Sequence, residues 1–389
     1  MEMKSIKILL INDFLYGGGA EVVFREINHI LNNNRIRVDI FYKEEKQKLI
    51  QSPLSYIYSL SNKRKLKRLF RNNCYDIVIV LNYASAFSPS ILSVINDYKQ
   101  RQGFKVIYNA HDAHLICPNS GLNYFQNGKM KRFDEKMTVS TFLSKRLDYR
   151  GHVFSILKKI QWVNAYKVLK LQNTIDIIVT PSYFLKERIN SFYPNKDIKV
   201  IRNPAIDHCF KQPSRIGLKG EILHIIFFGR LSDEKGLIPF IEALKNVTIP
   251  FIFDIYGEGK IKNDIEKAIF ENNLQSKISL KGSIDHGTLL QKLNNYDAMV
   301  LPSIMYENAP LSIVEAAASQ MHILTMQYGG MEELAKCVGN YYFIDPLSSE
   351  KLDSIFAYLK DARFEPSDLS EFTKTVFEKR ILNLLNSIC

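Results

Sequence analysis

Short apolar runs alternate with amphipathic helical segments along almost the whole chain, and this alternation limits the folds that are open to it. An apolar run bounded by turn signals predicts a buried strand, and repeated strand–helix units predict a parallel sheet with helices on both faces. The series predicts an α/β protein with two tandem Rossmann-like domains that face each other across a cleft. We expect its strands at Ile6–Asp13, Val38–Tyr42, Asp76–Leu81, Lys105–Asn109, Ile175–Thr180, Ile198–Ile201, Leu223–Phe228, Ile252–Tyr256, Ile278–Lys281, Ala298–Leu301, Ile323–Met326 and Tyr341–Ile344.

Interruptions of this series set the expected domain boundaries. The 389 residues are enough for two domains of ordinary size. Pro213, Gly217 and Gly220 predict a linker over 209–220, between a first domain at 1–208 and a second domain at 221–366. The remaining residues, 367–389, predict a C-terminal helix that packs back on the first domain.

The net positive charge of the chain is confined to its first half. The net charge is +12. Residues 1–208 hold 33 Lys and Arg against 17 Asp and Glu, a net charge of +16, whereas residues 209–389 hold 19 against 23, a net charge of −4. A strongly basic half indicates a polyanionic partner, which could be nucleic acid, an anionic membrane or a phosphorylated acceptor.

The cellular compartment is predicted from hydropathy and from the cysteines. No apolar run approaches the ~20 residues of a membrane span. The N-terminal apolar run is short and is typical of a first strand rather than of a signal peptide. The five cysteines are scattered without a CxxC pair or metal-ligand spacing, which suits a reducing cytoplasm.

The stretch Pro302–Ser319 carries two carboxylates eight positions apart, Glu307 and Glu315. It follows a predicted buried strand, and Pro310 suits the first turn of a helix because its missing N–H costs nothing there. Glu307 is therefore expected on the loop that leaves the strand, and Glu315 one turn into the helix. Free N–H groups at this helix start favour an anion, and the two carboxylates suit a ligand that also carries hydroxyls, such as a sugar and a ribose.

Basic residues follow the first strand of the second half, in the run Phe227–Gly236. Arg230 offers a bidentate fork and Lys235 a point charge, and the two together suit a diphosphate. An ordinary surface loop is the alternative for this run taken alone. The Glu307/Glu315 stretch on a neighbouring strand–helix turn favours the diphosphate.

Two further turns of the first half follow predicted strands. Gly18 and Gly19, within the run Tyr16–Glu21, allow the backbone to approach a ligand ahead of a helix N-terminus. A tight turn without a ligand is the equally weighted alternative. His111 and Asp112 lie at the end of another strand, where a side chain can reach the cleft, although a lone histidine is more often structural.

The chain resembles the retaining GT-B glycosyltransferases of family four in the order and spacing of four motifs. These are GGAE at residues 18–21, HD at 111–112, FGRLSDEKG at 228–236 and the E-x7-E pair Glu307/Glu315. The resemblance covers almost the whole chain. It implies that Arg230 and Lys235 hold the diphosphate of a nucleotide-sugar donor and stabilise it as it leaves.

The same resemblance implies roles for the other candidate residues. Glu307 and His111 contact the transferred sugar, and Glu315 takes the ribose hydroxyls. Ile284 lies against the base, and the backbone of Asn308, Ala309 and Leu311 surrounds the sugar and the phosphate. Gly18 and Gly19 approach the phosphate from the first domain. No Asp-x-Asp occurs in the chain, so we expect no metal and no cofactor besides the nucleotide-sugar co-substrate.

The basic first half is expected to serve the acceptor. Lys63–Arg71 has six basic residues in nine, with Leu66, Leu69 and Phe70 at helical spacing, and Thr141–Gln172 repeats this pattern with seven Lys and Arg and one acid. Both segments suit a helix on an anionic membrane. The acceptor expected from the resemblance is a lipid-diphosphate-linked or oligosaccharide chain in cell-surface polysaccharide synthesis, at the inner face of the membrane.

Three other functions remain open at this point. A sugar-nucleotide epimerase shares the two-domain fold, and free sugar released without acceptor would favour it. A non-catalytic, membrane-associated partner subunit is disfavoured because Arg230, Lys235, Glu307 and Glu315 are all present. A nucleic-acid binder would need a recognisable base-reading or stacking module, and the chain has none.

Overall fold

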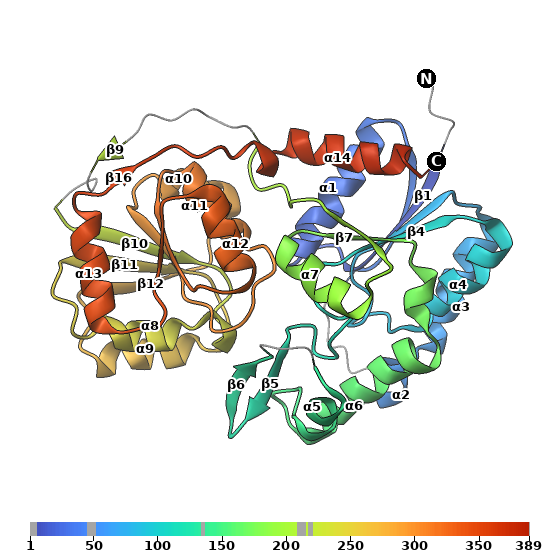
Figure 1. Cartoon of the computed structure of the whole chain (residues 1–389), viewed down its shortest axis with the longest axis horizontal. Coiled ribbons are helices and arrows are strands. Elements are labelled where there is room, and N and C mark those ends of the chain that lie inside the picture. The colour runs from blue at the N-terminus through green and yellow to red at the C-terminus, as the bar shows by residue number, and fades with distance from the viewer. Residues whose placement is uncertain (1–5, 45–51, 134–136, 208–214, 217–220, 389) are drawn as a thin grey trace. The chain divides into compact units, whose positions relative to one another are not determined.

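The computed structural model describes residues 6–44, 52–133, 137–207, 215–216 and 221–388. It divides into two compact units, unit 1 with Met1–Asn203 and Phe377–Cys389 and unit 2 with Pro204–Val376 (Figure 1). The boundary between the two units thus falls between Asn203 and Pro204, whereas the sequence predicted that the first domain ends at residue 208. Most of the predicted linker 209–220 lies outside the described residues; its described part, Arg215–Ile216, is strand β9, which pairs antiparallel with β16 (Arg363–Phe364).

Unit 1 is built on a parallel six-stranded sheet with the order β2-β1-β3-β4-β7-β8. The chain moves from β1 to β2 on one side and then returns to the other side of β1 for β3, so the winding direction reverses between β1 and β3. The strands are β1 (Lys7–Phe14), β2 (Arg37–Lys43), β3 (Ile77–Val80), β4 (Lys105–Asn109), β7 (Ile177–Thr180) and β8 (Asp197–Val200). The helices that follow the strands are α1 (Gly19–Asn33), α4 (Ser90–Gln102) and α7 (Tyr183–Phe192).

The core of unit 1 explains why α1 forms where it does. Val23, Phe24, Ile27 and Leu31 recur at helical spacing and are all buried against β1 and its neighbours. β3 is buried at all four of its positions, as expected for the inner strand of a parallel sheet.

The sequence interpretation of Lys63–Arg71 is partly wrong. These residues do form a helix, α3 (Leu60–Asn72), but Leu66 and Phe70 are fully buried and Phe70 stacks on Tyr98. The apolar stripe of this helix therefore belongs to the core of unit 1, because a surface helix packs through its apolar face. α3 presents basic side chains to solvent, and Leu60, at its first position, is its only largely exposed apolar side chain.

The segment between β4 and β7 forms a small substructure of its own. It contains the hairpin β5 (Asn123–Gln126) and β6 (Lys129–Arg132), then α5 (Val139–Ser144) and α6 (His152–Val163). α6 ends at Val163, because the turn at Asn164–Val168 is π-helical and Lys170 then adopts a left-handed conformation with φ of 51°. The short helix α2 (Pro53–Ile57) packs against α6, where the Gln161 side chain donates a 2.6 Å hydrogen bond to the Tyr56 carbonyl.

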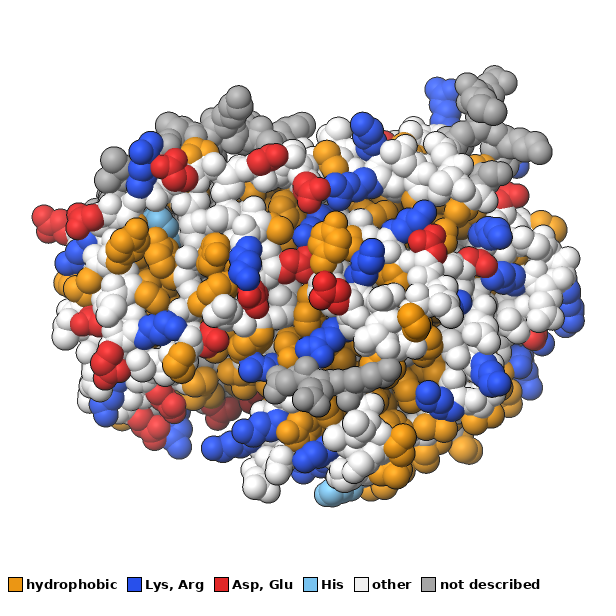
Figure 2. All heavy atoms as spheres, in the orientation of Figure 1, with side chains coloured by type: hydrophobic (Ala, Val, Ile, Leu, Met, Phe, Trp, Pro, Cys, Tyr) orange, Lys and Arg blue, Asp and Glu red, His pale blue; other side chains and the backbone are white. Residues whose placement is uncertain are grey.

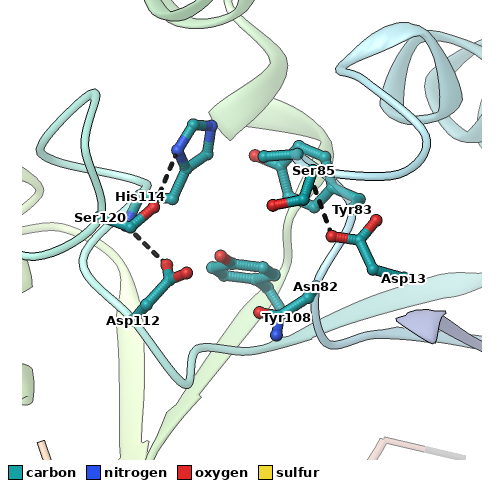
Figure 3. Close-up of a pocket in the computed structure, with 9 residues that line it drawn as sticks. Asp13, Asn82, Tyr83, Ser85, Tyr108, Asp112, His114 and Ser120 are labelled. Atoms are coloured by element: carbon teal, nitrogen blue, oxygen red, sulfur yellow. Dashed lines mark hydrogen bonds between the residues drawn. The ribbon is translucent and has the colours of Figure 1, made fainter. Parts of the chain in front are cut away.

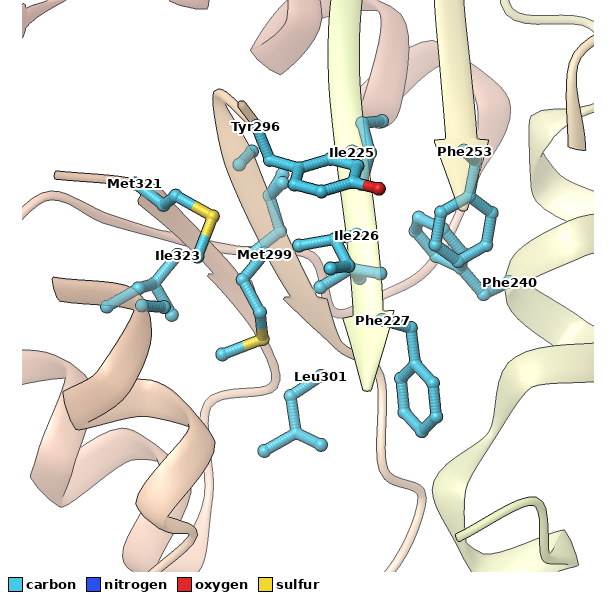
Figure 4. Packing of buried hydrophobic residues seen from close by; sticks show 14 of the residues in the cluster. Ile225, Ile226, Phe227, Phe240, Phe253, Tyr296, Met299, Leu301, Met321 and Ile323 are labelled. Atoms are coloured by element: carbon cyan, nitrogen blue, oxygen red, sulfur yellow. The ribbon is translucent and has the colours of Figure 1, made fainter. Parts of the chain in front are cut away.

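Unit 2 repeats the parallel plan with the order β12-β11-β10-β13-β14-β15, and its winding reverses between β10 and β13. Figure 4 shows the two central strands side by side, with Ile225, Phe227, Met299 and Leu301 packed between the covering helices. The strands are β10 (Leu223–Phe228), β11 (Phe251–Tyr256), β12 (Ile278–Gly282), β13 (Ala298–Leu301), β14 (His322–Thr325) and β15 (Tyr341–Phe343). The helices are α8 (Leu237–Leu244), α9 (Lys262–Glu271), α10 (His286–Leu293), α11 (Leu311–Ala318), α12 (Gly329–Val338) and α13 (Ser349–Leu359).

The C-terminal helix α14 (Lys374–Asn386) packs on unit 1, as predicted. Phe377, Ile381, Leu384 and Leu385 are buried in the same core cluster as the side chains of α1 and β1. The helix begins at Lys374 rather than near Asp368, because residues 370–372 form a separate 3-10 turn. No helix among the described residues is long and apolar enough to span a bilayer.

Candidate functional site

The reversal of strand order in unit 2 brings together the two loops that the sequence singled out. β10 and β13 are neighbours, so the loop with Arg230 and Lys235 and the loop with Glu307 both leave the carboxyl edge of the sheet at this point. Doubly wound sheets bind their ligands at such a switch point.

Two glycines allow other backbone to approach the loop that carries Glu307 closely. Gly236 has a left-handed φ of 67°, and a Cβ added to it would lie 2.1 Å from the Pro302 carbonyl oxygen. Gly330 at the start of α12 is equally constrained, because a Cβ there would lie 1.9 Å from the Asn308 carbonyl oxygen. The backbone N–H of Ile304 also donates to the Glu234 carbonyl at 2.9 Å. The loops around Lys235 and Glu307 are thus fixed by backbone contacts rather than by flexible side chains.

Lys235 and Glu307 form an ion pair at the centre of this arrangement. The Lys235 ammonium lies 2.7 Å from Glu307 Oε1, and the Ser303 hydroxyl donates to the same oxygen at 2.8 Å. Both charged side chains are mostly buried, at 17% and 21% exposure. Oε1 is therefore held by two donors, whereas Oε2 makes no hydrogen bond to the described residues.

Arg230 lies at the same edge but points into solvent. Its side chain is 73% exposed, and Nη2 donates to Glu234 Oε1 at 3.1 Å. The structure therefore separates the two predicted diphosphate ligands into a buried, fixed lysine and an exposed arginine that carries its own carboxylate partner.

Glu315 is buried behind the loop and pairs with a histidine. Its side chain is 7% exposed, and Oε1 lies 3.0 Å from His286 Nε2. The hydrogen bond to Glu315 raises the pKa of His286, against the opposing effect of its partial burial. His286 is the first residue of α10, two positions after Ile284, so this contact brings the predicted base-side residue to the predicted ribose-side carboxylate.

The helix behind Glu307 begins as predicted, with a shift of one position. Pro310 is the N-cap of α11 and Leu311 its first residue. The N–H groups of the first turn of a helix have no intrahelical acceptor, so they favour an anion. Asn308 and Ala309 precede this turn, and Ala309 packs against the core of unit 2.

The glycine turn of unit 1 is partly occupied by a carboxylate of its own. Gly18 is the N-cap of α1, and its N–H donates to Glu21 Oε2 at 2.7 Å. One of the amides that the sequence assigned to phosphate is thus already bonded. Gly19 faces open space, since nothing lies within 4 Å of a Cβ added there.

A small polar pocket lies in unit 1, at the switch point between β1 and β3. Its volume is about 50 Å³, and Figure 3 shows Asp13, Tyr83, Tyr108 and Asp112 around it. Asp13 fixes the loop after β3, because its two oxygens accept the N–H groups of Ala86 at 2.9 Å and Ser85 at 3.1 Å. The other lining residues are Asn82, Ala84, His114 and Ser120.

Burial perturbs the titratable groups of this pocket. It raises the pKa of Asp13 to about 7 and that of Asp112 to about 6, although backbone N–H donors act against it. Burial also lowers the pKa of His114 to about 3, and the ring hydrogen-bonds Ser120 at 3.3 Å. His111 is neutral for the same reason, with a pKa of about 4, but it does not line the pocket.

Several residues of these sites were missed in the sequence. His286 could have been found from Asp285, which caps α10 and so fixes the next residue beside Ile284. Asp13 is a charged residue at the end of an apolar strand, which is a usable signal at a switch point. Ser303 and His114 gave no signal of comparable strength. Among the described residues, no group of three or more His, Cys, Asp or Glu is arranged to hold a metal.

Comparison with known proteins agrees with this architecture. Residues 211–375 match the model of the family described as glycosyl transferases group 1. An uncharacterized protein from the cps region of Klebsiella pneumoniae is 25% identical over 386 residues, which cover 90% of this chain and 92% of that protein.

Two solved structures share the fold over nearly the full length. The apo form of the lipopolysaccharide outer core galactosyltransferase WaaB superposes with a TM-score of 0.66 at 17% identity, covering 99% of this chain and 100% of WaaB. Anabaena HepE in complex with UDP-glucose superposes with a TM-score of 0.62 at 15% identity, covering 98% of this chain and 100% of HepE.

Proposed function

We propose that this chain, whose residues 211–375 match the group 1 glycosyltransferases and which has the GT-B fold, moves a sugar from a nucleotide-diphosphate sugar to a saccharide acceptor with retention of anomeric configuration. The observation that carries the proposal is the Lys235–Glu307 ion pair at the switch point of unit 2. A positive and a negative group held side by side suit a ligand that is part diphosphate and part sugar.

Each partner of this pair has capacity left for a ligand. The lysine ammonium has three N–H donors, and Glu307 takes one of them. The other two can bind diphosphate oxygens, and the fixed positive charge stabilises the negative charge that grows on the diphosphate as it leaves. Glu307 Oε2 can accept hydrogen bonds from the hydroxyls of the sugar, while Glu315 takes the ribose.

The comparisons support the donor class and the biological setting. HepE was solved with UDP-glucose, and the Klebsiella relative is described as a protein of a cps region. These descriptions favour a nucleotide-sugar donor and a role in cell-surface polysaccharide synthesis. The proposed acceptor is a lipid-diphosphate-linked saccharide at the cytoplasmic face of the membrane, because the basic half of the chain suits an anionic partner.

The pocket of unit 1 is the proposed place for an acceptor hydroxyl. It lies at the switch point of its own sheet and is lined by carboxyl and hydroxyl groups. Asp112→Asn is expected to raise the KM for acceptor and to leave the affinity for the nucleotide unchanged. Equal weakening of both ligands would contradict this assignment.

The test is a ligand screen followed by product analysis. The protein is titrated calorimetrically with UDP-, GDP- and ADP-sugars in EDTA, and one base class is expected to bind. Transfer to a saccharide acceptor is then followed by NMR, which reports the anomeric configuration. Inversion would refute retention, transfer that needs added manganese would refute metal independence, and epimerised donor without transfer would identify an epimerase.

A further inference from the structure

The helices α5 and α6 of unit 1 carry an unusual number of exposed apolar side chains. Val139 is 77% exposed, and Leu143 and Val153 are each 69% exposed. Isolated exposed hydrophobic residues are normal, but gathered ones mark an interaction surface. Nine large hydrophobic side chains are exposed between residues 139 and 169: Val139, Leu143, Tyr149, Val153, Phe154, Ile156, Ile160, Val168 and Leu169.

The exposed side chains form stripes on two helices that are held together. On α6, positions 153, 156 and 160 share one face, whereas Trp162 is buried. The Lys159 ammonium donates to the Leu143 carbonyl at the end of α5 at 3.0 Å, and the rings of Phe142 and Trp162 lie 5.8 Å apart. We define the α5–α6 face as the exposed side chains of Val139, Leu143, Val153, Ile156 and Ile160.

The charge around this face has one sign. Between residues 137 and 172 the only acid is Asp148, whose side chain is 1% exposed and is paired with Arg150 at 2.9 Å and Lys158 at 3.0 Å. No carboxylate of this segment therefore reaches solvent. Figure 2 shows hydrophobic side chains mixed with blue Lys and Arg side chains at the foot of the view, where Figure 1 places α5 and α6.

We infer that the α5–α6 face docks on the surface of an anionic lipid bilayer. Aliphatic side chains can enter the boundary between headgroups and acyl chains, while Lys and Arg reach the headgroups on their flexible stems. Tyr149 is 61% exposed and carries a ring with a polar tip, which suits the same boundary. The aliphatic stripes offer nothing to a nucleic acid, which is bound through phosphate contacts and base stacking.

The assignment differs from the one that the sequence suggested. α3 has more basic residues, but Leu66 and Phe70 are buried, so α3 has no exposed apolar stripe to accompany its charge. The proposed lipid-linked acceptor gives such a contact its use, and in that respect the inference rests on the proposed function. Vesicle binding itself is measured without donor or acceptor, so its failure and a failure of transfer are separate results.

The test is flotation of the full-length protein with vesicles of phosphatidylcholine containing about one-third phosphatidylglycerol. The variant V153S/I156S/I160S removes only exposed aliphatic side chains. It is expected to need at least roughly tenfold more lipid for half-maximal binding. The matched control F270S/Y358S removes two exposed apolar side chains of unit 2, at 70% and 63% exposure, and is expected to bind as the wild type does.

The charge contribution is tested on the same vesicles. K167S/K170S is expected to weaken binding by about tenfold at low salt and by less at high salt, since these lysines add electrostatic attraction. K63S/R64S/K67S/R68S on α3 is expected to have a smaller effect than V153S/I156S/I160S. Unchanged melting curves would show that each variant is folded.

Several results would overturn the inference. The wild type could fail to float with anionic vesicles at low salt, it could float equally well with pure phosphatidylcholine, or V153S/I156S/I160S could bind like the wild type. A dimer that this variant dissociates, or RNA binding that it abolishes, without any vesicle binding, would assign the α5–α6 face to a second copy of the chain or to nucleic acid instead.

Discussion

Removal of Lys235 should harm nucleotide binding in two ways, and one of them can be reversed by a second substitution. In Lys235→Ala the diphosphate loses a donor and a positive charge. It also meets Glu307, whose carboxylate was neutralised at 2.7 Å and is now an unbalanced negative charge beside the phosphate. Lys235→Ala is therefore expected to be worse than the double variant Lys235→Ala/Glu307→Gln.

The size of the rescue can be worked from the geometry. A phosphate oxygen and Glu307 Oε1 that share one ammonium group would lie roughly 4.5 Å apart. Two unit charges at that distance repel by about 1 kcal/mol in water and by about 4 kcal/mol at an effective dielectric constant of 20. Since the Glu307 side chain is only 21% exposed, screening by solvent is incomplete, and the lower value sets a minimum of about a fivefold recovery of affinity.

Calorimetric titration with the nucleoside diphosphate of the donor measures the four affinities of this cycle. Lys235→Ala should weaken binding by roughly 10²-fold, and adding Glu307→Gln should restore at least about fivefold. Glu307→Gln alone should reduce transfer without weakening nucleotide binding, since it removes a negative charge beside the phosphate. Lys336→Ala is the matched control, because Lys336 and Glu332 form a 2.6 Å pair on α12 of the same unit. A double variant that binds no better than Lys235→Ala would show that the diphosphate does not lie beside Glu307.

Three further predictions concern contacts that lie within one unit or the other. Glu315 raises the pKa of His286, so protonated His286 holds the Glu315 carboxylate at low pH and keeps it from the ribose. Nucleotide affinity should therefore rise as the pH increases through that raised pKa. His286→Gln should flatten this dependence of affinity on pH, as measured by calorimetry. Stability changes in the opposite direction, because the contribution of the pair is present below the pKa of unfolded histidine and is lost as the pH rises through the raised pKa; Asp285 and Lys374 are the other charges near the ring. Gly236→Ala should destabilise unit 2 by at least about 2 kcal/mol in denaturant unfolding, because its Cβ would meet a carbonyl oxygen, whereas Gly19→Ala in open space should be nearly neutral. Asp148→Asn should lower the free energy of unfolding by about 3 kcal/mol, because it leaves two cations without their buried partner. Burial would raise the pKa of Asp148, but hydrogen bonds from Arg150 and the charge of Lys158 outweigh it and hold this pKa at about 2. The wild type should therefore stay more stable than the variant until the pH falls below about 4.

The inner strands of both sheets could be predicted from sequence because they are buried on both faces. A run such as Ala298–Leu301 is apolar throughout, and turn residues bound it on both sides. The hairpin β5–β6 was missed for the opposite reason: its short strands are polar and half-exposed, so neither composition nor alternation marks them.

The site was predictable where chemistry and topology agree. Lys235 and Glu307 lie on the two loops of one switch point, and the structure joins them directly. The partner of Glu315 was not predictable, because His286 lies 29 positions away and only the fold of unit 2 brings the two side chains together. In the same way, the sequence shows that α3 and α6 are both basic and amphipathic, but only the fold shows that the apolar stripe of α6 faces solvent.

The return of α14 to unit 1 has a consequence for the order in which the chain can fold during synthesis. Phe377, Ile381, Leu384 and Leu385 complete the core of a unit whose other residues end at Asn203. These four side chains leave the ribosome only after all of residues 204–376, so unit 2 can finish folding while unit 1 still exposes the apolar surface that α14 will cover. The first unit to be translated is thus the last to be completed, and a nascent chain that stops after Val376 carries an unfilled core and is a substrate for chaperones.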